Sequence, residues 1–554
     1  MNSLFQNILL SSFIINLPNN VRLVQSFFNS LRLYIFYYNI TRPKSTFLTI
    51  YKSMVSSSFT VLSLVPYIQK KIKDQIDPIK VNIINDINKN SEEINNIVEE
   101  SGIVPNGLFK DSIESYRLLE LLKNLKSLDD SLVNKGKVSG AIYSDVNSKS
   151  IRFMNEIFPL YFKTNPLHPD IFPSLRMIEK WLIEISIELY NGDDNTRGSI
   201  TSGGTESIFL ACKAYRDLYN LKNPEIIAPI TVHPAFDKAC ECLKIKLIKV
   251  PIVFSGEKYE ESTLDLNYYK SKINSNTILL VASAPSFPHG EIDPIREIAE
   301  IGLEYNKPVH IDCCLGGFVL PFLDHKDRID FSIDGITSIS ADFHKYAYSP
   351  KGISIVMYKN KYFSDNQYFI TDSWSGGIYA TNTLLGSRPG NVIVMTWANM
   401  LNLGQRYYEI TSKEIKFFTK NLAYSLNKIQ GIRVIGNPEN LLNVVAFTSD
   451  SHDIYSINEH LQKCGWNLNP LQFPSAIHLC VTENHTSKEK MDDFLNCVKE
   501  SLKEIPAKRN ILDNSDAYDN NDNSGSIYGT SQKITNRSFV KTIARHYIDS
   551  LYFS

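Results

Sequence analysis

SISADFHKYAYSPKG, residues 338–352, is the stretch that decides the fold. The apolar pattern of residues 335–342 is typical of a buried strand, so the Ala-Asp-x-His-Lys that ends it places Lys345 on a loop at a sheet edge. A lysine amine becomes a nucleophile only where burial or positive neighbours lower its pKa. His344 and Lys351 could supply part of that positive charge. By itself the motif fits a reactive lysine or an ordinary solvated one.

Strand and helix patterns alternate on both sides of this stretch, which predicts an α/β fold with helices on both faces of a sheet. Strands are expected at 226–232, 244–252, 277–284, 308–313, 335–342 and 352–358, and helices at 205–222, 234–243 and 295–306. A long helix is expected after about residue 410, leading into a smaller α+β unit with strands near 444–449 and 475–482. The prediction is a large doubly wound α/β domain followed by a small C-terminal α+β domain.

The composition allows a large core and excludes some partners. The chain has 554 residues, of which 43% are hydrophobic and 21% charged, close to ordinary globular values. Its net charge of -1 gives no electrostatic reason to bind nucleic acid. The eight cysteines form no CxxC pair, so no metal site is predicted, and scattered thiols suggest a reducing compartment.

The first seventy residues differ from the rest. Residues 1–21 and 53–69 carry no charge, but neither is a clean span of about 20 apolar residues. Either one stretch is a marginal membrane anchor, with Lys70 and Lys71 on the cytosolic side, or the leader is amphipathic or poorly ordered. The predicted organisation is an apolar leader at 1–70, a linker and N-terminal segment at 71–175, the large domain at 176–410, the small domain at 411–510, a disordered insert at 511–525 and a tail at 526–554.

Two further motifs fall where such a sheet would place functional groups. SGGTES, residues 202–207, opens a helix whose free N–H groups and Thr205 hydroxyl could bind an anion, although such a start is often only a cap. HIDCCLGG, residues 310–317, places Asp312 at a strand end. That carboxylate could keep a pyridine nitrogen protonated, or it could simply be satisfied by backbone donors.

Taken in order, SGGTE, the histidine of VHPAFDKA, HxD and HK resemble the fold-type-I pyridoxal-phosphate enzymes, in the group that includes the amino-acid decarboxylases. The closest resemblance is to the sphingosine phosphate lyases, over about 139–505 and 524–551. It is carried by SGAIY, NPLHPDIFPSLRMIE, TSGGTESIFLACKAYRD, FPHGEIDPI, HIDCCLGGF, SISADFHKYAYSPKG, GGIYATNTLLGSRPG, GWNLNPLQFP and GSIYGTSQ.

The resemblance implies roles for single residues. Lys345 would hold pyridoxal phosphate as a Schiff base, Asp312 would face the pyridine nitrogen and His233 would lie over the ring. The cofactor phosphate would be held by Gly204, Thr205 and His344. Ser387 would reach the cofactor of a second subunit, which implies a homodimer with shared active sites.

The resemblance also implies a substrate. Tyr143, Asn165, His168 and Lys351 would surround the phosphate of a sphingoid base phosphate, which needs several charge-assisted donors. The enzyme would cleave it in a retro-aldol reaction to a long-chain aldehyde and phosphoethanolamine. Location at the endoplasmic reticulum membrane, facing the cytosol, is expected. The general base stays open among Lys345, His233, His289 and the cofactor phosphate.

Some residues depart from the family pattern. Phe343 replaces a usual Thr beside Lys345, where its bulk would affect the rate. Ala347 replaces a usual Gly, Cys313 a usual Ala, and TDSWSGG at 371–377 a usual TDWQGG. Two alternatives remain: an amino-acid decarboxylase, which shares the cofactor residues, and an inactive relative that acts as a binding protein.

Overall fold

The structure is a computed structural model that describes residues 91–103, 108–133, 135–143, 149–255, 261–324, 328–507 and 537–552, with positions 81, 84, 85 and 88. The chain divides into two compact units, residues 97–524 and residues 1–96 with 525–554. The described part of the second unit is α18 (Arg537–Tyr552) and the start of α5 (Ser91–Ser101). The predicted leader and the insert at 511–525 lie outside the described residues.

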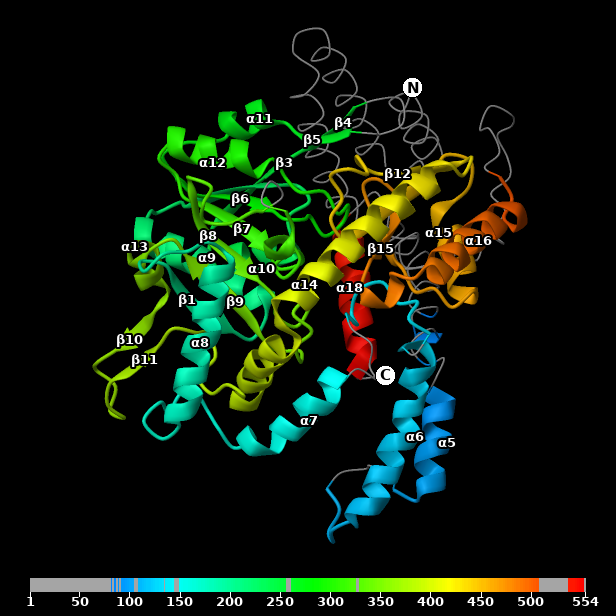
Figure 1. The fold of residues 1–554 in the computed structure, drawn as a ribbon, viewed down its shortest axis with the longest axis horizontal. Helices are drawn as coiled ribbons and strands as arrows, with labels where there is room; N and C mark the ends of the chain where they lie inside the picture. Colours follow the sequence, from blue (N-terminus) through cyan, green and yellow to red (C-terminus); the bar gives the residue numbers. More distant parts are fainter. Residues whose placement is uncertain are drawn as a thin grey trace, which may run out of the picture. The chain divides into compact units, whose positions relative to one another are not determined.

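The larger unit is built on a seven-stranded mixed sheet in the order β1-β9-β8-β7-β6-β2-β3 (Figure 1). Strand β9 is antiparallel to both its neighbours, and the pairs from β8 to β3 are parallel. The strands are β1 (Arg197–Thr201), β2 (Glu225–Pro229), β3 (Lys246–Val250), β6 (Thr277–Ser283), β7 (Val309–Cys313), β8 (Ile336–Ala341) and β9 (Ser354–Tyr358). The α/β prediction is confirmed.

Helices cover both faces because successive strand residues point to opposite sides. In β9, Val356 packs with α9 (Gly204–Tyr219) and α10 (Pro234–Leu243), whereas Ile355 packs in the core that contains α8 (Pro173–Leu189) and α12 (Ile295–Glu304). Because β6, β7 and β8 are parallel, their carboxyl ends lie at the same edge of the sheet, between the helices that cover its two faces. That edge carries Asp312 and Lys345.

The smaller sheet follows in the order β12-β13-β15-β14. Its strands are β12 (Ile432–Val434), β13 (Val444–Ser449), β14 (Asn469–Leu471) and β15 (Ala476–Cys480), and its helices are α15 (Ile454–Lys463) and α16 (Lys488–Glu504). The other described elements are α6 (Ser115–Val133), α7 (Lys149–Tyr161), α11 (Leu266–Ser271), α13 (Lys361–Ser364) and the hairpins β4 (Ile252–Ser255) with β5 (Glu261–Leu264) and β10 (Phe369–Thr371) with β11 (Tyr379–Thr381).

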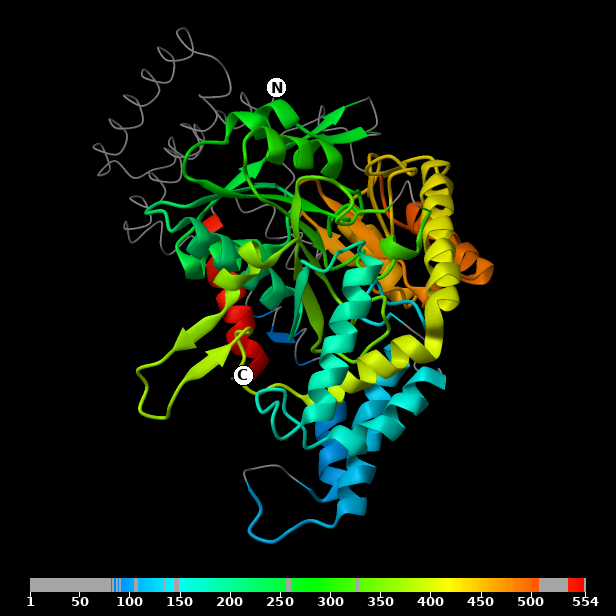
Figure 2. The same cartoon turned by 60° about the vertical axis from the view of Figure 1, so that its left-hand side comes forward.

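Several predicted boundaries were wrong. The long helix α14 (Gly390–Asn427) begins some twenty residues before the expected start near 410, and it breaks at Gly404, where φ is 73°; Figure 2 shows the bend. A positive φ favours glycine, so the break comes from a residue that the periodicity did not mark. Strand β2 ends at Pro229 rather than 232, because the chain turns toward α10, which His233 caps. Among the described residues, no helix has both the length and the apolar character needed to cross a membrane.

Candidate active site

Lys345 lies on a tight turn directly after β8. The backbone N–H of Tyr348 donates to Lys345 O at 3.1 Å, and the small domain fixes the turn through Tyr346, whose hydroxyl donates to Val481 O at 2.6 Å. The Lys345 side chain is 21% exposed, and its Nζ lies 2.8 Å from Oδ2 of Asp342. The amine is therefore held at the sheet edge by a rigid loop.

Asp342 was missed as a site residue, although it stands in the motif that was quoted. It is 3% exposed, and its Oδ1 accepts from Ser354 Oγ at 2.6 Å. Burial opposes charge on Lys345, but the Asp342 carboxylate outweighs it and raises the pKa of Lys345. The expected lowering of the Lys345 pKa by His344 and Lys351 is thus wrong for this state of the chain, because the carboxylate was left out. Acidic residues two or three positions before a candidate lysine are the signal that could have found it.

The predicted anion site lies beside this ion pair. Gly204 begins α9, and a Cβ there would come 2.8 Å from Asp342 Oδ1 and 2.7 Å from Cys314 Sγ, so only glycine fits. Thr205 is exposed on the first turn. Glu206 is buried, and its carboxylate accepts from the N–H of Ser202 at 2.6 Å and of Leu384 at 2.8 Å. The Glu206 carboxylate therefore ties the helix start to neighbouring backbone, and no side chain caps the first turn, whose N–H groups are the donors that an anion would use.

Asp312, His233 and His344 are each oriented by the backbone. Asp312 is 6% exposed at the end of β7, and its Oδ1 accepts from the N–H of Cys314 at 3.0 Å. His233 caps α10, and its Nδ1 accepts from the N–H of Ala235 at 3.1 Å, which leaves the proton of the neutral ring on Nε2. His344 Nδ1 lies 2.8 Å from Ile353 O and Nε2 lies 3.6 Å from Asp342. Burial lowers the pKa of His344.

Of the four predicted phosphate ligands, two lie together. Lys351 Nζ sits 4.7 Å from the centre of the Tyr143 ring and donates to His344 O at 3.3 Å. Desolvation and the neighbouring Lys345 lower the pKa of Lys351, and burial raises that of Tyr143. We call Tyr143, Asp342, His344, Lys345 and Lys351 the lysine cluster.

The other two predicted ligands belong to a second group of contacts. Asn165 Nδ2 donates to Ser387 Oγ at 3.0 Å, and its Oδ1 accepts from the N–H of Arg388 at 3.3 Å. Arg388 Nη1 is 2.6 Å from Glu179. His168 and Ser387 are exposed. We call Asn165, His168, Ser387 and Arg388 the loop cluster.

Two other residues singled out in the sequence have defined surroundings. His289 is 3% exposed, and burial together with His478 lowers its pKa to about 4. Phe343 is fully buried and packs on Phe318 with ring centres 4.7 Å apart. Neighbouring side chains of the turn point in different directions and this one enters the core, while the effect of Phe343 on the rate stays a prediction.

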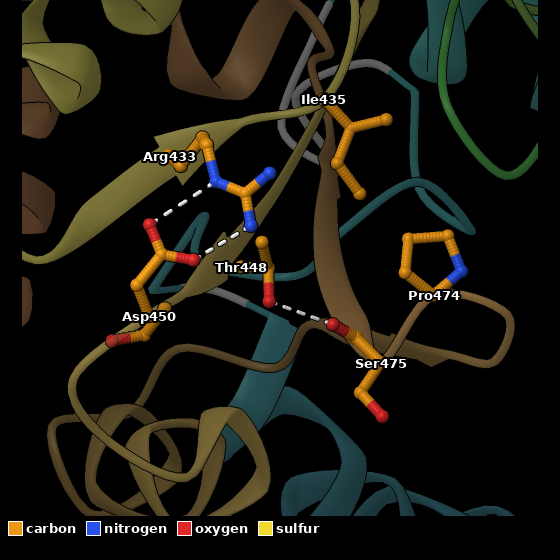
Figure 3. A pocket seen from close by; sticks show the side chains of 7 residues that line it. Arg433, Ile435, Thr448, Asp450, Pro474 and Ser475 are labelled. Carbon is orange, nitrogen blue, oxygen red and sulfur yellow. Dashed lines mark hydrogen bonds and ion pairs between the residues drawn. The ribbon is translucent and has the colours of Figure 1, made fainter. Parts of the chain in front are cut away.

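A cavity of about 270 Å³ occurs elsewhere, in the small domain. It is lined by Arg433, Ile435, Thr448, Ser449, Asp450, Pro474 and Ser475 (Figure 3). Arg433 is already bound there by Asp450, at 2.6 and 3.2 Å. None of the predicted site residues lines this cavity, so the residues at the edge of the large sheet remain the candidate site.

Comparisons with known proteins show the family of the chain. Residues 174–449 match the family model described as the pyridoxal-dependent decarboxylase conserved domain. The chain is 38% identical to sphingosine-1-phosphate lyase 1 of Rattus norvegicus, over 89% of this chain and 84% of that protein. It is 40% identical to sphingosine-1-phosphate lyase of Dictyostelium discoideum, over 79% and 81%.

A solved structure agrees as well. The structure of a sphingosine-1-phosphate lyase from Burkholderia pseudomallei superposes with a TM-score of 0.68 at 32% identity, covering 72% of this chain and 93% of that one. The residues that match the family model, 174–449, include the lysine motif and the helix start at Gly204. The chain therefore belongs to the sphingosine-1-phosphate lyases, a family of pyridoxal-phosphate-dependent enzymes.

Proposed function

We propose that this chain cleaves phosphorylated sphingoid bases to a long-chain aldehyde and phosphoethanolamine, using pyridoxal phosphate. The observation that carries the proposal is the position of Lys351 and Tyr143 beside Lys345. The cation lies 4.7 Å from the tyrosine ring and next to the lysine turn. A point charge and a hydroxyl next to the reactive amine suit a phosphate monoester.

The residues present fit the cofactor. A glycine-opened helix start with an exposed Thr205 offers donors to a phosphate, Asp312 offers a buried carboxylate to a ring nitrogen, and Lys345 offers a primary amine. We assign Gly204, Thr205 and His344 to the phosphate and His233 to the ring face. When bound, pyridoxal phosphate supplies an electron sink for the electron pair released as a carbon–carbon bond breaks.

The chain's own groups would handle the protons. In the retro-aldol reaction a base takes the proton of the hydroxyl beside the amine-bearing carbon, and that carbon later needs a proton. Lys345 Nζ lies 2.8 Å from Asp342, whose carboxylate raises the pKa of the lysine. Because the raised pKa keeps Lys345 protonated near pH 7, its ammonium carries a proton for the carbon but is poorly placed to accept one from the hydroxyl.

The histidines differ as bases. His233 already uses Nδ1 to accept from Ala235, so it would have to give up a helix cap to accept another proton there. Burial keeps His289 neutral near pH 7, since its pKa is lowered to about 4. The lowered pKa also makes the His289 imidazole a weak base, so the base stays open among Lys345, His233, His289 and the cofactor phosphate.

Two finer statements belong to the same proposal. A homodimer is supported by the exposed loop cluster and by the hairpin β10–β11, where Trp374 is 58% exposed, Ile370 64% and Ile378 79%, since exposed apolar patches of this kind mark interfaces. Attachment of the leader to the endoplasmic reticulum membrane is supported by its uncharged stretches and by the basic Lys70 and Lys71 after them.

The direct test is incubation of the purified full chain with a sphingoid base phosphate. Aldehyde and phosphoethanolamine should appear in equal amounts, and the unphosphorylated base should be a much poorer substrate. Carbon dioxide release from an amino acid, with no aldehyde from the lipid, would favour the decarboxylase alternative. Deleting residues 1–70 should abolish vesicle flotation while leaving turnover of detergent-dispersed substrate close to that of the full chain; flotation of the shortened chain would refute the membrane assignment.

A further inference from the structure

Two packed helices of the small domain bring metal-binding side chains together, away from the active site. His460 and Cys464 follow one another by one turn at the end of α15, and Cys497, Glu500 and Glu504 lie on one face of α16. One ligand atom each of His460, Cys464 and Glu500 lies within 4.8 Å of the others. Neither the proposed reaction nor the predicted site uses any of these residues.

The histidine is oriented as a metal ligand would be. His460 Nδ1 lies 3.3 Å from Oε2 of Glu504. Its Nε2 is buried, and no described residue hydrogen-bonds with it. A carboxylate on one ring nitrogen fixes the tautomer and leaves the other nitrogen to bind a cation, and this arrangement is common behind zinc-bound histidines. A buried nitrogen without a partner is otherwise costly.

The thiols add the second kind of ligand. Cys464 follows the last residue of α15 and Cys497 lies on α16, so each helix carries one thiol. Zinc binds sulfur at about 2.3 Å and imidazole nitrogen at about 2.0–2.1 Å, which places the ligand atoms of a tetrahedron about 3.3–3.8 Å apart. The ligand atoms of His460, Cys464 and Glu500 lie within 4.8 Å of one another, so their separations need to close by about 1–1.5 Å at most, and Glu500 is exposed and able to rotate. The nearby ammonium of Lys137 is paired with Asp493 at 2.8 Å, which offsets its charge.

We propose that His460, Cys464 and Glu500 form a zinc site that joins α15 to α16, with Cys497 as the fourth ligand and Glu504 holding the histidine. Zinc is the divalent ion that combines sulfur, imidazole and carboxylate ligands in a tetrahedron. Binding displaces the thiol protons to solvent, so affinity falls as pH is lowered. The site is structural: it fixes the two helices that cover the small sheet.

The experiment is a titration of the tag-free, full-length holoenzyme, stripped of metal by a chelator and dialysed. Co²⁺ should give the thiolate charge-transfer band and the strong visible bands of a tetrahedral site, at one ion per chain, and Zn²⁺ should displace it. Zn²⁺ should also raise the Tm. Cys464→Ser should abolish the cobalt spectrum, and Glu504→Gln should weaken zinc binding about ten- to hundredfold.

Controls separate this site from other metal-binding groups. Cys242→Ser removes an exposed thiol on α10 and should leave the spectrum unchanged. Glu500→Gln changes an exposed side chain and should leave the fold intact, so it serves as the second variant should Cys464→Ser fail to fold. It should weaken zinc binding at least tenfold. Absence of a tetrahedral cobalt spectrum, or a spectrum that survives both Cys464→Ser and Glu500→Gln, would overturn the proposal. Lyase turnover is measured in parallel and should not depend on these variants.

Discussion

The lysine cluster and the loop cluster are built in opposite ways. In the lysine cluster, Asp342 is 3% exposed and ion-paired with Lys345, and both come from one short motif after β8. In the loop cluster, Asn165 and Ser387 are 222 residues apart in sequence, and His168 is exposed. The charged groups of the lysine cluster are paired within one chain, whereas the loop cluster exposes His168 and Ser387 to solvent. This is the difference expected of the proposed homodimer, in which the lysine cluster performs chemistry in its own subunit and the loop cluster acts on a neighbouring one.

The largest effect is expected at the centre of the lysine cluster. Lys345→Ala should abolish turnover and covalent retention of the cofactor, because no other described lysine shares its ion pair with Asp342. Borohydride reduction followed by peptide mass analysis locates the cofactor on the chain. Lys361→Ala, which changes an exposed lysine on α13, is the control. Cofactor fixed to another lysine in the Lys345 variant would show that the cluster has been misassigned.

Asp342→Asn tests whether the ion pair matters beyond the lysine itself. Loss of a charge-assisted contact should lower kcat about ten- to hundredfold. Removing one partner of a buried pair should also lower the free energy of unfolding of the cofactor-free protein by up to about 3–5 kcal/mol. Ser354→Ala, which removes only the hydroxyl that donates to Asp342, should have a smaller effect on both. Equal effects of the two variants would mean that packing, not charge, explains the loss.

The same pair predicts a pH dependence in the cofactor-free protein. The neighbouring Lys345 and His344 lower the pKa of Asp342 against the effect of burial, so its contribution is complete above its ordinary pKa of about 3.9 and is lost as pH falls through the lowered value. The pKa of Lys345 is raised, so its contribution is complete below about 10.4 and is lost above the raised value. The stability difference between wild type and Asp342→Asn should therefore be constant from about pH 7 to 9, change below about pH 6.5 where His344 begins to titrate, and shrink below about pH 4, as measured by chemical unfolding.

The contrast also explains what could be read from the sequence. The alternating pattern predicted the α/β fold because buried strands and amphipathic helices are local features. Lys345, Asp312 and Gly204 were found because each stands at the end of a strand or the start of a helix. Asp342 was missed because its contact with Lys345 depends on a turn that brings a side chain back over three residues.

The features that the sequence did not predict depend on tertiary contacts. The pairing of Asn165 with Ser387 joins segments that no local pattern connects. Phe343 precedes Lys345 by two residues, yet its ring packs on Phe318 in the core, a contact that no local pattern indicates. The start of α14 was misplaced because the break at Gly404 depends on a backbone conformation, and helical periodicity does not report such a conformation.

Lys351→Ala addresses the outer part of the lysine cluster. It should lower kcat/KM for the phosphorylated base about ten- to hundredfold, since one charge-assisted contact is lost. Cofactor content should barely change, because the donors at the start of α9 are separate. Tyr143→Phe should act in the same direction but more weakly, because it removes a neutral donor. An unchanged kcat/KM, or loss of cofactor from the Lys351 variant, would contradict the assignment to substrate phosphate.

The loop cluster can be tested by mixing variants. His168→Ala should lower kcat/KM about two- to tenfold, as expected for one lost donor, and it changes an exposed side chain. If His168 serves the partner's site, a dimer of one His168→Ala chain and one Lys345→Ala chain has one intact site, composed of Lys345 from the first and His168 from the second. Random pairing in an equal mixture unfolded and refolded together should then recover about a quarter of wild-type activity from the mixed dimers, in addition to about a quarter of the activity of the His168→Ala chain alone. If each chain supplies both residues to its own site, no mixed dimer has an intact site, and the mixture can only average its two parents. Activity above that average requires one site built from residues of both chains. Such a result would show that the loop cluster acts across the interface, and activity equal to the average would show that it acts within its own subunit.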